Sequence, residues 1–287
     1  MYTLIVNPIS GGGKALATLP KAEAELKARG IEYRVLYTEL PITKELFASV
    51  PCGHDDTVII IGGDGTIFDA LNSLSEHDMV IMYVPCGTGN DFVKTLHLPS
   101  DPIKALRLQL DGKPRPIDFV KANEMCFMNV CGTGFDVEVL KKLGAFRKKF
   151  TGLKAYLMAL IQALKEYKPI SCEISVDGGK YERKKLCIVS IGNGKYFGGG
   201  MKAVPDAEPF DGLLDVVEVA PVKRWQVIFM LPKFISGRHT KLKFAKTYKC
   251  RSFDIRGSEL TIQMDGELRK MSKLSLSVIS NKLRFSM

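Results

Sequence analysis

The hydrophobic and polar positions of the first 116 residues follow two alternating patterns. Short apolar runs are followed by segments with apolar residues three or four positions apart, as in buried strands alternating with amphipathic helices. The clearest run is Val58–Ile61, which is typical of a strand buried on both faces. This alternation favours an α/β fold with an open parallel sheet. The predicted strands are 4–6, 31–37, 58–61 and 79–84, the predicted helices are 14–29 and the segment after 66, and 41–50 is a short helix or turn.

From about residue 117 the pattern becomes that of a mostly β region. Short apolar segments are bounded by turn residues, and three Asp-Gly pairs are typical of antiparallel hairpins. We therefore expect an α/β domain over 1–118 and a second, mostly β domain over 119–281. The predicted strands are 116–121, 125–131, 170–176, 186–191, 213–219 and several after 248; the predicted helices are 150–167 and 222–235; the Asp-Gly turns are at 177–179, 211–212 and 265–266.

Composition and charge narrow the class of protein only slightly. The longest apolar run, 155–161, is too short to span a bilayer, and the N-terminus leads directly into a strand pattern without a signal peptide. Seven cysteines without a Cys-x-x-Cys pair indicate reduced thiols in a cytoplasmic protein. The net charge of +10 suits nucleic acid, an anionic membrane or a polyphosphate ligand, and equally a soluble basic protein with none of these.

Several predicted strands end in glycine-rich turns that open helices. The segment Gly62–Thr66 carries one carboxylate, Asp64, and the segment Asn7–Lys14 carries a hydroxyl and a lysine. Glycines let the backbone approach a ligand, and a helix start offers free N–H groups to phosphate. A carboxylate beside phosphates makes sense if a divalent cation lies between them. The alternative is a tight turn in which Asp64 only caps a helix.

An ordered set of motifs resembles the bacterial diacylglycerol-kinase-type lipid kinase family, which is related more distantly to sphingosine, ceramide and NAD kinases. The resemblance implies a phosphofructokinase-like α/β domain, an NAD-kinase-like β-sandwich domain, and ATP bound between them. It also implies that the last strand, 282–287, returns to the first domain. Phe68 and Asp69 replace an Asn-Glu pair that is usual in the family, and Lys94 stands where arginine is common. The motifs are 7–11, 62–66, 85–92, 196–201, 211–215 and 265–267.

The resemblance also implies an ATP site built from the first two of these motifs and their neighbours. Phosphoryl transfer requires phosphates held in place and their charge neutralised, for which Asp64 and Asp91 would position a catalytic Mg²⁺. The residues expected to hold ATP are Asn7, Ser10, Gly12, Lys14, Thr38, Gly62, Gly63, Asp64, Gly65, Thr66 and Thr88.

Glu267 is the expected general base, because a carboxylate beside the turn 265–266 could face an interdomain cleft. From turn chemistry alone, a plain hairpin is the better interpretation of this segment. Asp118 could join the same polar network or act as a turn or cap residue.

A second, structural Mg²⁺ is implied by the segment 208–213. By position, its ligands would be the Asp211 carboxylate and the backbone carbonyls of Glu208 and Leu213, with water completing the shell. The alternative is an ordinary turn that opens the strand at 213–219.

A lipid substrate would require contact with a membrane surface, and two segments have a suitable composition. Each combines cations with apolar or aromatic residues, which suits anionic lipid, although core helices with solvated lysines would show the same pattern. The first group is Lys141, Lys142, Arg147, Lys148, Lys149 and Lys154 with Leu153, Leu157, Leu160 and Leu164; the second is Lys223, Arg224, Trp225, Lys233, Phe234 and Arg238.

These observations predict an ATP- and Mg²⁺-dependent lipid kinase, with diacylglycerol as the favoured acceptor. We expect a cytoplasmic protein that associates transiently with the inner face of the membrane. No nucleic-acid-binding module is present in the sequence. A soluble-substrate kinase of the NAD kinase type and a non-catalytic nucleotide-binding protein remain alternatives. The oligomeric state, a homodimer included, stays open.

Overall fold

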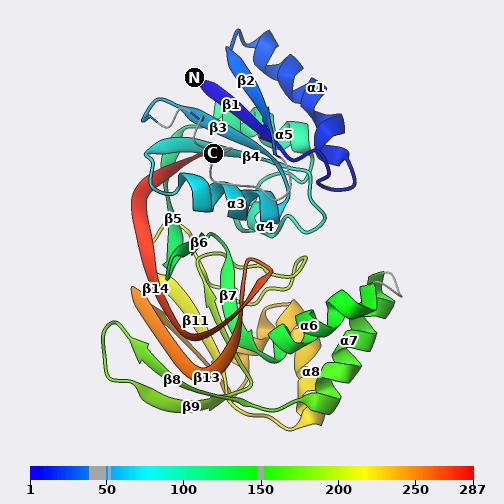
Figure 1. Cartoon of the computed structure of the whole chain (residues 1–287), viewed down its shortest axis with the longest axis vertical. Coiled ribbons are helices and arrows are strands. Elements are labelled where there is room, and N and C mark those ends of the chain that lie inside the picture. Colours follow the sequence, from blue (N-terminus) through cyan, green and yellow to red (C-terminus); the bar gives the residue numbers. More distant parts are fainter. Residues whose placement is uncertain (39–49, 51–52, 148–151) are drawn as a thin grey trace.

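The computed structural model describes residues 1–38, 50, 53–147 and 152–287, with the backbone alone at 147 and 152–157 (Figure 1). The first domain alternates strands and helices, as the hydrophobic pattern predicts. The helix or turn expected at 41–50 falls almost entirely outside the described residues. The elements are β1 (Tyr2–Val6), α1 (Lys14–Ala28), β2 (Tyr33–Tyr37), β3 (Thr57–Gly62), α3 (Asp64–Leu74), β4 (Met79–Pro85), α4 (Asp91–Thr95) and α5 (Pro102–Asp111).

The four strands of the first domain form a parallel sheet in the order β2-β1-β3-β4. β3 is buried along its whole length. Its alternate residues belong to different cores: Val58 and Ile60 pack in the cluster that contains α3, and Ile59 and Ile61 pack in the cluster that contains α1. This two-sided burial confirms the parallel α/β layer and places the ends of β1, β3 and β4 at one edge.

The second domain is mostly antiparallel, with β7, β10, β11 and β12 in one run and a β8–β9 hairpin beside β13. Three helices, α6, α7 and α8, lie together on one side of these strands (Figure 1). The elements are β5 (Pro114–Ala122), β6 (Met125–Phe127), β7 (Val130–Gly134), α6 (Phe135–Arg147), α7 (Gly152–Glu166), β8 (Ile170–Val176), β9 (Glu182–Leu186), β10 (Ile188–Gly192), β11 (Leu214–Val219), α8 (Arg224–Ile235), η1 (Arg238–Lys241), β12 (Ala245–Cys250), β13 (Ser252–Met264) and β14 (Glu267–Ser286).

Two long strands connect the domains. β5 and β14 pair antiparallel on both sides of an irregularity between Ile279 and Leu283, where Asn281 has a φ of 61°. Beyond it, Leu283–Phe285 pairs parallel with β4 of the first domain. β14 therefore runs from the second domain into the first sheet, and β5 lies beside it along the same path (Figure 1).

The second domain corrects four details of the sequence prediction. The predicted strand 125–131 is two strands, because the N–H groups of Met128 and Asn129 donate to a side chain rather than to a ladder. The predicted strand 186–191 is also divided, between β9 and β10. The helix α6 was not predicted at all. The turn 211–212 precedes β11 but joins no tight hairpin, whereas the turns at 177–179 and 265–266 do, as expected.

Candidate functional site

The glycine turns after β3 and β4 lie back to back. The carbonyl oxygen of Gly62 accepts the N–H groups of Cys86 (2.7 Å) and Gly87 (3.0 Å). A Cβ on Gly63 would lie 3.0 Å from the Cα of Gly87, and a Cβ on Gly87 would lie 2.5 Å from the Cα of Gly63. Only glycine fits at this contact, because either side chain would collide with backbone.

The turn after β1 joins the same edge. The Asn7 side-chain amide donates to the Thr66 hydroxyl at 3.1 Å, and a Cβ on Gly11 would lie 1.9 Å from the Cys86 carbonyl oxygen. Gly11, Gly12 and Gly13 all have positive φ (61°, 67° and 92°), so the chain here presents backbone that a substituted residue would strain. Three strand ends therefore meet at one edge, where Gly11, Gly12, Gly65 and Thr88 are exposed.

The remaining predicted nucleotide residues differ in how closely they approach this surface. The Ser10 hydroxyl oxygen would be 3.3 Å from a Cβ on Gly63. Lys14 begins α1 with an exposed side chain, and Thr88 is also exposed. Thr38 is buried at the end of β2, where its N–H donates to the Val6 carbonyl at 2.9 Å. Gly65 has open space beside it.

The carboxylates of Asp64 and Asp91 lie close together beside Gly89. A Cβ on Gly89 would be 2.9 Å from Asp64 Oδ2 and 3.8 Å from Asp91 Oδ2. Burial, and then the charge of Asp91, raise the pKa of Asp64. Asp91 is held by the Lys94 ammonium at 2.8 Å and by the Gly199 N–H at 2.7 Å.

Hard oxygen ligands of this kind suit Mg²⁺, and a divalent cation would relieve the repulsion between the two carboxylates. Nowhere in the described part of the chain do three or more His, Cys, Asp or Glu side chains gather as a metal site. An ion that keeps most of its water ligands needs only one or two protein carboxylates, so Asp64 and Asp91 fit it.

Asp265 is the main site residue that the sequence analysis missed. It lines the same small cavity as Asp64 and Asp91, together with Asn129 and Phe197. Its carboxylate accepts the N–H groups of residues 128, 129 and 130 at 2.9, 3.0 and 2.9 Å. Burial is the largest cause that raises its pKa to about 7, against the effect of these donors. The Asp-Gly pair at 265–266 is the sequence signal for this residue, but turn chemistry accounts for the pair equally well.

Glu267 lies on the other side of this turn. Its side chain is 51% exposed and faces Arg269, with 3.5 Å between the charged atoms. Its charge contributes, after burial, to raising the pKa of Asp69 in the first domain. The structure thus brings Asp64, Asp91 and Asp265 together and leaves Glu267 near Asp69, in an accessible position.

The residues predicted for a second metal lie apart from these carboxylates. Asp211 accepts the Lys249 ammonium at 2.7 Å, and Asp215 accepts it at 2.9 Å. Asp211 also accepts the Leu213 N–H at 3.0 Å, and the Glu208 carboxylate bonds to the Lys195 ammonium at 2.6 Å. A lysine already neutralises the predicted ligand.

Asp118 joins this segment to the interdomain strands. Its carboxylate accepts the Gly212 N–H at 2.8 Å and the Ser280 hydroxyl at 2.5 Å. Its observed contacts therefore hold the turn before β11 against β14.

An apolar pocket lies between α6, α8 and β10. Its lining is hydrocarbon or thioether except for Asp136, whose two buried carboxylate oxygens receive no hydrogen bond from another side chain of the described residues. Burial raises the pKa of Asp136 to about 6. The lining residues are Phe135, Asp136, Val139, Leu140, Ile188, Met201, Val227, Met230, Leu231 and Phe234.

One loop connects this pocket with the carboxylates. Phe197 and Met201 pair through backbone hydrogen bonds of 2.9 and 3.0 Å. Met201 lines the apolar pocket, Phe197 lines the carboxylate cavity, and Gly199 between them donates to Asp91. The polar and apolar sites therefore share the segment 197–201.

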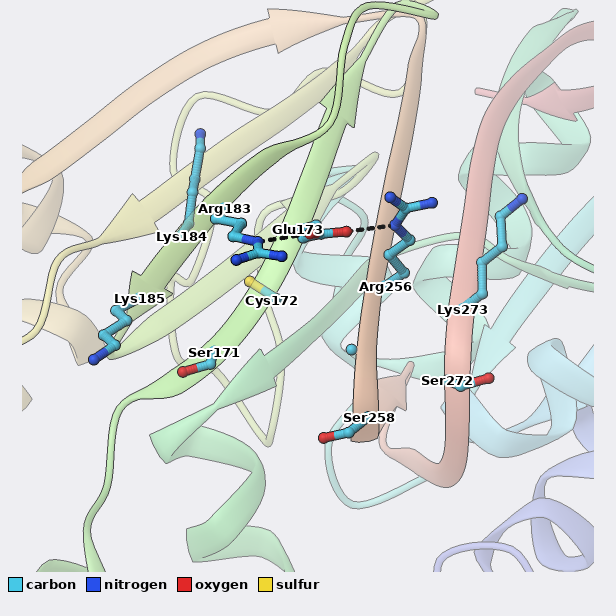
Figure 2. A pocket seen from close by; sticks show the side chains of 11 residues that line it. Ser171, Cys172, Glu173, Arg183, Lys184, Lys185, Arg256, Ser258, Ser272 and Lys273 are labelled. Atoms are coloured by element: carbon cyan, nitrogen blue, oxygen red, sulfur yellow. Dashed lines mark hydrogen bonds and ion pairs between the residues drawn. The ribbon is translucent and has the colours of Figure 1, made fainter.

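A larger hollow of about 820 Å³ lies elsewhere, on β8, β9, β13 and β14. Figure 2 shows Glu173 between Arg183 and Arg256, with which it forms ion pairs of 3.1 and 2.6 Å. Lys185 and Lys273 also line it. None of the predicted catalytic or nucleotide-binding residues belongs to it.

The structure also corrects part of the predicted membrane surface. Leu160 and Phe234 are buried, and Leu164 packs against the same core. Lys142 forms an ion pair with Glu166. Lys148 and Lys149 lie outside the described residues, as do the side chains of Arg147, Leu153, Lys154 and Leu157.

Comparison with known families agrees with this architecture. The diacylglycerol kinase catalytic domain matches residues 1–122, and the YegS C-terminal NAD kinase beta sandwich-like domain matches residues 129–286. The chain belongs to the diacylglycerol-kinase-type lipid kinase family. Both domains of the family are therefore present, in the order that the resemblance implies.

Individual members of the lipid kinase family are similar along most of the chain. A diacylglycerol kinase from Mycobacterium tuberculosis is 28% identical over 272 residues, covering 92% of this chain and 88% of the relative. A diacylglycerol kinase from Staphylococcus aureus is 28% identical over 269 residues, covering 92% and 85%.

Solved structures extend the comparison at the level of the fold. A diacylglycerol kinase from Bacillus anthracis superposes with a TM-score of 0.72 at 24% identity, covering 99% of this chain and 95% of that one. An NAD kinase from Archaeoglobus fulgidus, solved in complex with ATP, has a TM-score of 0.54 at 14% identity, covering 100% and 94%. As a member of this kinase family, the chain is a phosphotransferase. No helix in the described residues is long and apolar enough to cross a membrane.

Proposed function

We propose that the protein is an ATP- and Mg²⁺-dependent kinase that transfers the γ-phosphate of ATP to a lipid hydroxyl, with diacylglycerol as the favoured acceptor and phosphatidic acid as its product. The observation that carries this proposal is the connection between two sites, because one loop joins the Asp64–Asp91 pair to a hydrocarbon-lined pocket of about 30 Å³. A polar acceptor such as NAD would gain little from a pocket lined by hydrocarbon.

The glycine turns supply the nucleotide site. Exposed backbone at Gly12 suits phosphate oxygens, Gly63 lets the turn after β3 approach Ser10 closely, and the exposed Lys14 ammonium offers a positive charge beside them. Asn7 and Thr66 hold each other in place and thereby fix two turns. Ser10, Thr38, Gly62, Gly65 and Thr88 complete the proposed ATP site.

Asp64 and Asp91 would hold Mg²⁺. The bound ion would neutralise phosphate charge and orient the transferred group. Lys94 fixes Asp91 from one side and the Gly199 N–H fixes it from the other, so the orientation of this carboxylate depends on both domains. Closure of the domains and positioning of the ligand would then be linked.

Glu267 is the proposed base that accepts the proton of the lipid hydroxyl. Its exposed carboxylate is free to meet an incoming acceptor, and Asp265 anchors the turn that carries it through three backbone N–H groups. Asp265 is the other candidate base, because its carboxylate lies in the cavity and burial raises its pKa to about 7.

A panel assay tests the acceptor class. Purified protein is incubated with γ-labelled ATP, Mg²⁺ and diacylglycerol, monoacylglycerol, a sphingoid base or a prenol in mixed detergent micelles, with NAD in a parallel reaction. We expect label on diacylglycerol and none with an Asp64→Asn variant. Label on NAD and on no lipid would overturn the proposal in favour of a soluble-substrate kinase, and nucleotide binding without transfer to any acceptor would indicate a non-catalytic protein.

A further inference from the structure

Helix α8 has apolar residues on two opposite faces. Val227, Met230 and Phe234 are buried toward α6 and β10. On the other face, Trp225, Ile228, Phe229 and Ile235 are 57%, 54%, 69% and 45% exposed. Positions 225, 228, 229 and 235 are linked through position 232 by spacings of three and four residues, so they form one continuous stripe. An ordinary surface helix has a polar outer face, and this helix does not.

The helix that carries this stripe and the segment that follows it in the sequence are strongly cationic. Between residues 222 and 246 the sequence has seven Lys or Arg residues and no Asp or Glu. All seven side chains are exposed, and none of them has a carboxylate within ion-pairing distance in the described part of the chain. They are Lys223, Arg224, Lys233, Arg238, Lys241, Lys243 and Lys246.

We propose that this stripe, defined by Trp225, Ile228, Phe229 and Ile235, docks on an anionic lipid bilayer. The aromatic and aliphatic side chains enter the boundary between headgroups and acyl chains, and the surrounding cations contact lipid phosphates. The inference rests on the proposed function, since it makes the membrane the source of the acceptor. It adds which surface meets the membrane and which residues enter it.

The position of α8 relative to the apolar pocket supports this orientation. The inner face of the helix lines that pocket, so a docked α8 would lie between the acyl chains and the pocket. A lipid passing beside the helix would exchange one hydrocarbon environment for another. Its chains would then avoid most of the cost of crossing water.

The charge distribution argues against a second copy of the chain as the occupant. Two stripes packed face to face would bring two sets of seven cations together, and like charges in a desolvated interface are unfavourable. An anionic membrane meets both features at once, because it offers hydrocarbon at the depth of the stripe and phosphate at the depth of the cations.

Trp225 is the only tryptophan in the chain, so its fluorescence reports directly on this stripe. Full-length protein is titrated, without ATP or acceptor, with vesicles of phosphatidylcholine alone or of phosphatidylcholine with 30% phosphatidylglycerol. We expect a blue shift of the emission with the anionic vesicles only, and quenching by lipids brominated near the headgroup end of the acyl chain. Unchanged emission while the protein co-sediments with the same vesicles would overturn the proposal.

Variants separate the stripe from general attraction by charge. Phe229→Ser combined with Ile228→Ser should weaken vesicle binding by about tenfold or more, because two large apolar side chains no longer enter the bilayer. The matched control is Lys185→Ala with Lys273→Ala, which removes two cations from the basic hollow (Figure 2) and should have little effect. The reverse result would move the docking surface to that hollow. Equal binding by all variants would also contradict the proposal.

A kinase assay keeps this inference distinct from the proposed function. In detergent micelles, the Ile228→Ser, Phe229→Ser variant should phosphorylate lipid at the wild-type rate, whereas in vesicles its rate should fall. Wild-type protein that binds vesicles through Trp225 but labels no lipid would refute the kinase and leave the docking surface. Size-exclusion chromatography of wild type and variant adds a last outcome: a dimer that only the wild type forms would show that a second copy covers the stripe.

Discussion

Two buried regions of the molecule each contain a carboxylate that is protonated more readily than usual, but the two carboxylates differ in their hydrogen-bond donors. Asp265, at the edge where the two domains meet, accepts three backbone N–H groups. Asp136, beneath α8, receives no hydrogen bond from another side chain in the described part of the chain, and only the N–H groups at the start of its own helix lower its pKa. Burial raises the pKa of the first to about 7 and that of the second to about 6.

This difference shows that the kind of site a buried carboxylate belongs to depends on its surroundings more than on its depth of burial. The described contacts around Asp265, Asp64 and Asp91 fix the orientation of these carboxylates, as the proposed site for charged phosphates and a metal requires. The pocket around Asp136 has a volume of about 30 Å³ and is lined almost entirely by hydrocarbon, so it offers apolar contact rather than a set of directed bonds. One loop, 197–201, borders both regions.

The proposed base gives the largest expected effect on the polar region. Glu267→Gln keeps the size of the side chain and removes its ability to accept a proton, so kcat should fall by roughly 10²–10⁴-fold. ATP affinity should change little, because Glu267 lies outside the glycine turns. Rates and ATP binding are measured separately, in detergent micelles and by calorimetry. If kcat is unchanged while Asp265→Asn is inactive, the base is Asp265.

The carboxylate pair gives the next effect. Asp64→Asn removes one charge of the proposed Mg²⁺ site and should lower kcat on the order of 10²–10³-fold, as for the loss of one electrostatic contact in a transition state. The variant should fold at least as well as wild type, because the charge that burial opposes is gone. The matched variant Asp69→Asn, outside the pair, should keep most of the activity. Full activity in a folded Asp64→Asn protein would remove the residue from the mechanism.

The sequence predicts the polar region better than the apolar one, for a physical reason. The strands around Val58–Ile61 are continuous apolar runs, and neighbouring parallel strands bring their carboxyl ends together. The proximity of Asp64 and Asp91 follows from this local pattern. Asp265 could not be placed in the same way, because its partners lie at 128–130, more than 130 residues earlier.

The helix α6 shows where the local pattern misled. The helical spacing is visible at Phe135, Val139 and Leu143, which are all buried. The β-branched residues at 137 and 139, however, directly follow a strand pattern, and such residues favour a strand over a helix. Asp136 looks like a solvated residue in a helix start, and its burial depends on α8, some 90 residues later. The formation of α6 and the burial of Asp136 both depend on tertiary packing, which the sequence pattern does not contain.

A pH series tests the apolar region. The pKa of Asp136 is about 6 in the folded chain and about 3.9 when unfolded, so the folded state binds more protons between these values. The free energy of unfolding should therefore fall as pH rises from 4 to 6, by about 2 kcal/mol for this group. Relative to wild type, Asp136→Asn should gain about that amount between pH 4 and pH 7. Urea unfolding at each pH measures it, and a difference that stays constant with pH would show that Asp136 is not a buried titrating group.

The smallest expected effect concerns Asp211, a carboxylate on the surface that accepts one backbone N–H group and one lysine ammonium. Asp211 already contacts the Lys249 ammonium, so a structural Mg²⁺ would have to compete with that cation. If Asp211 is a ligand, Mg²⁺ at ten times its Kd should stabilise the wild type by about 1.4 kcal/mol, or about 3–5 °C in Tm. Asp211→Asn should lose this response, and Glu267→Gln should keep it.

Lys249→Met makes the competition explicit, because it removes the ammonium and keeps a long side chain. Its Mg²⁺-dependent rise in Tm should begin at lower Mg²⁺ concentration than in the wild type. A response identical to wild type would show that Mg²⁺ does not bind where Lys249 does. If Glu267→Gln loses the stabilisation and Asp211→Asn retains it, the two roles are reversed: Glu267 would belong to a metal site, and the Asp211–Lys249 pair would be only an ion pair that holds the start of β11 against β12.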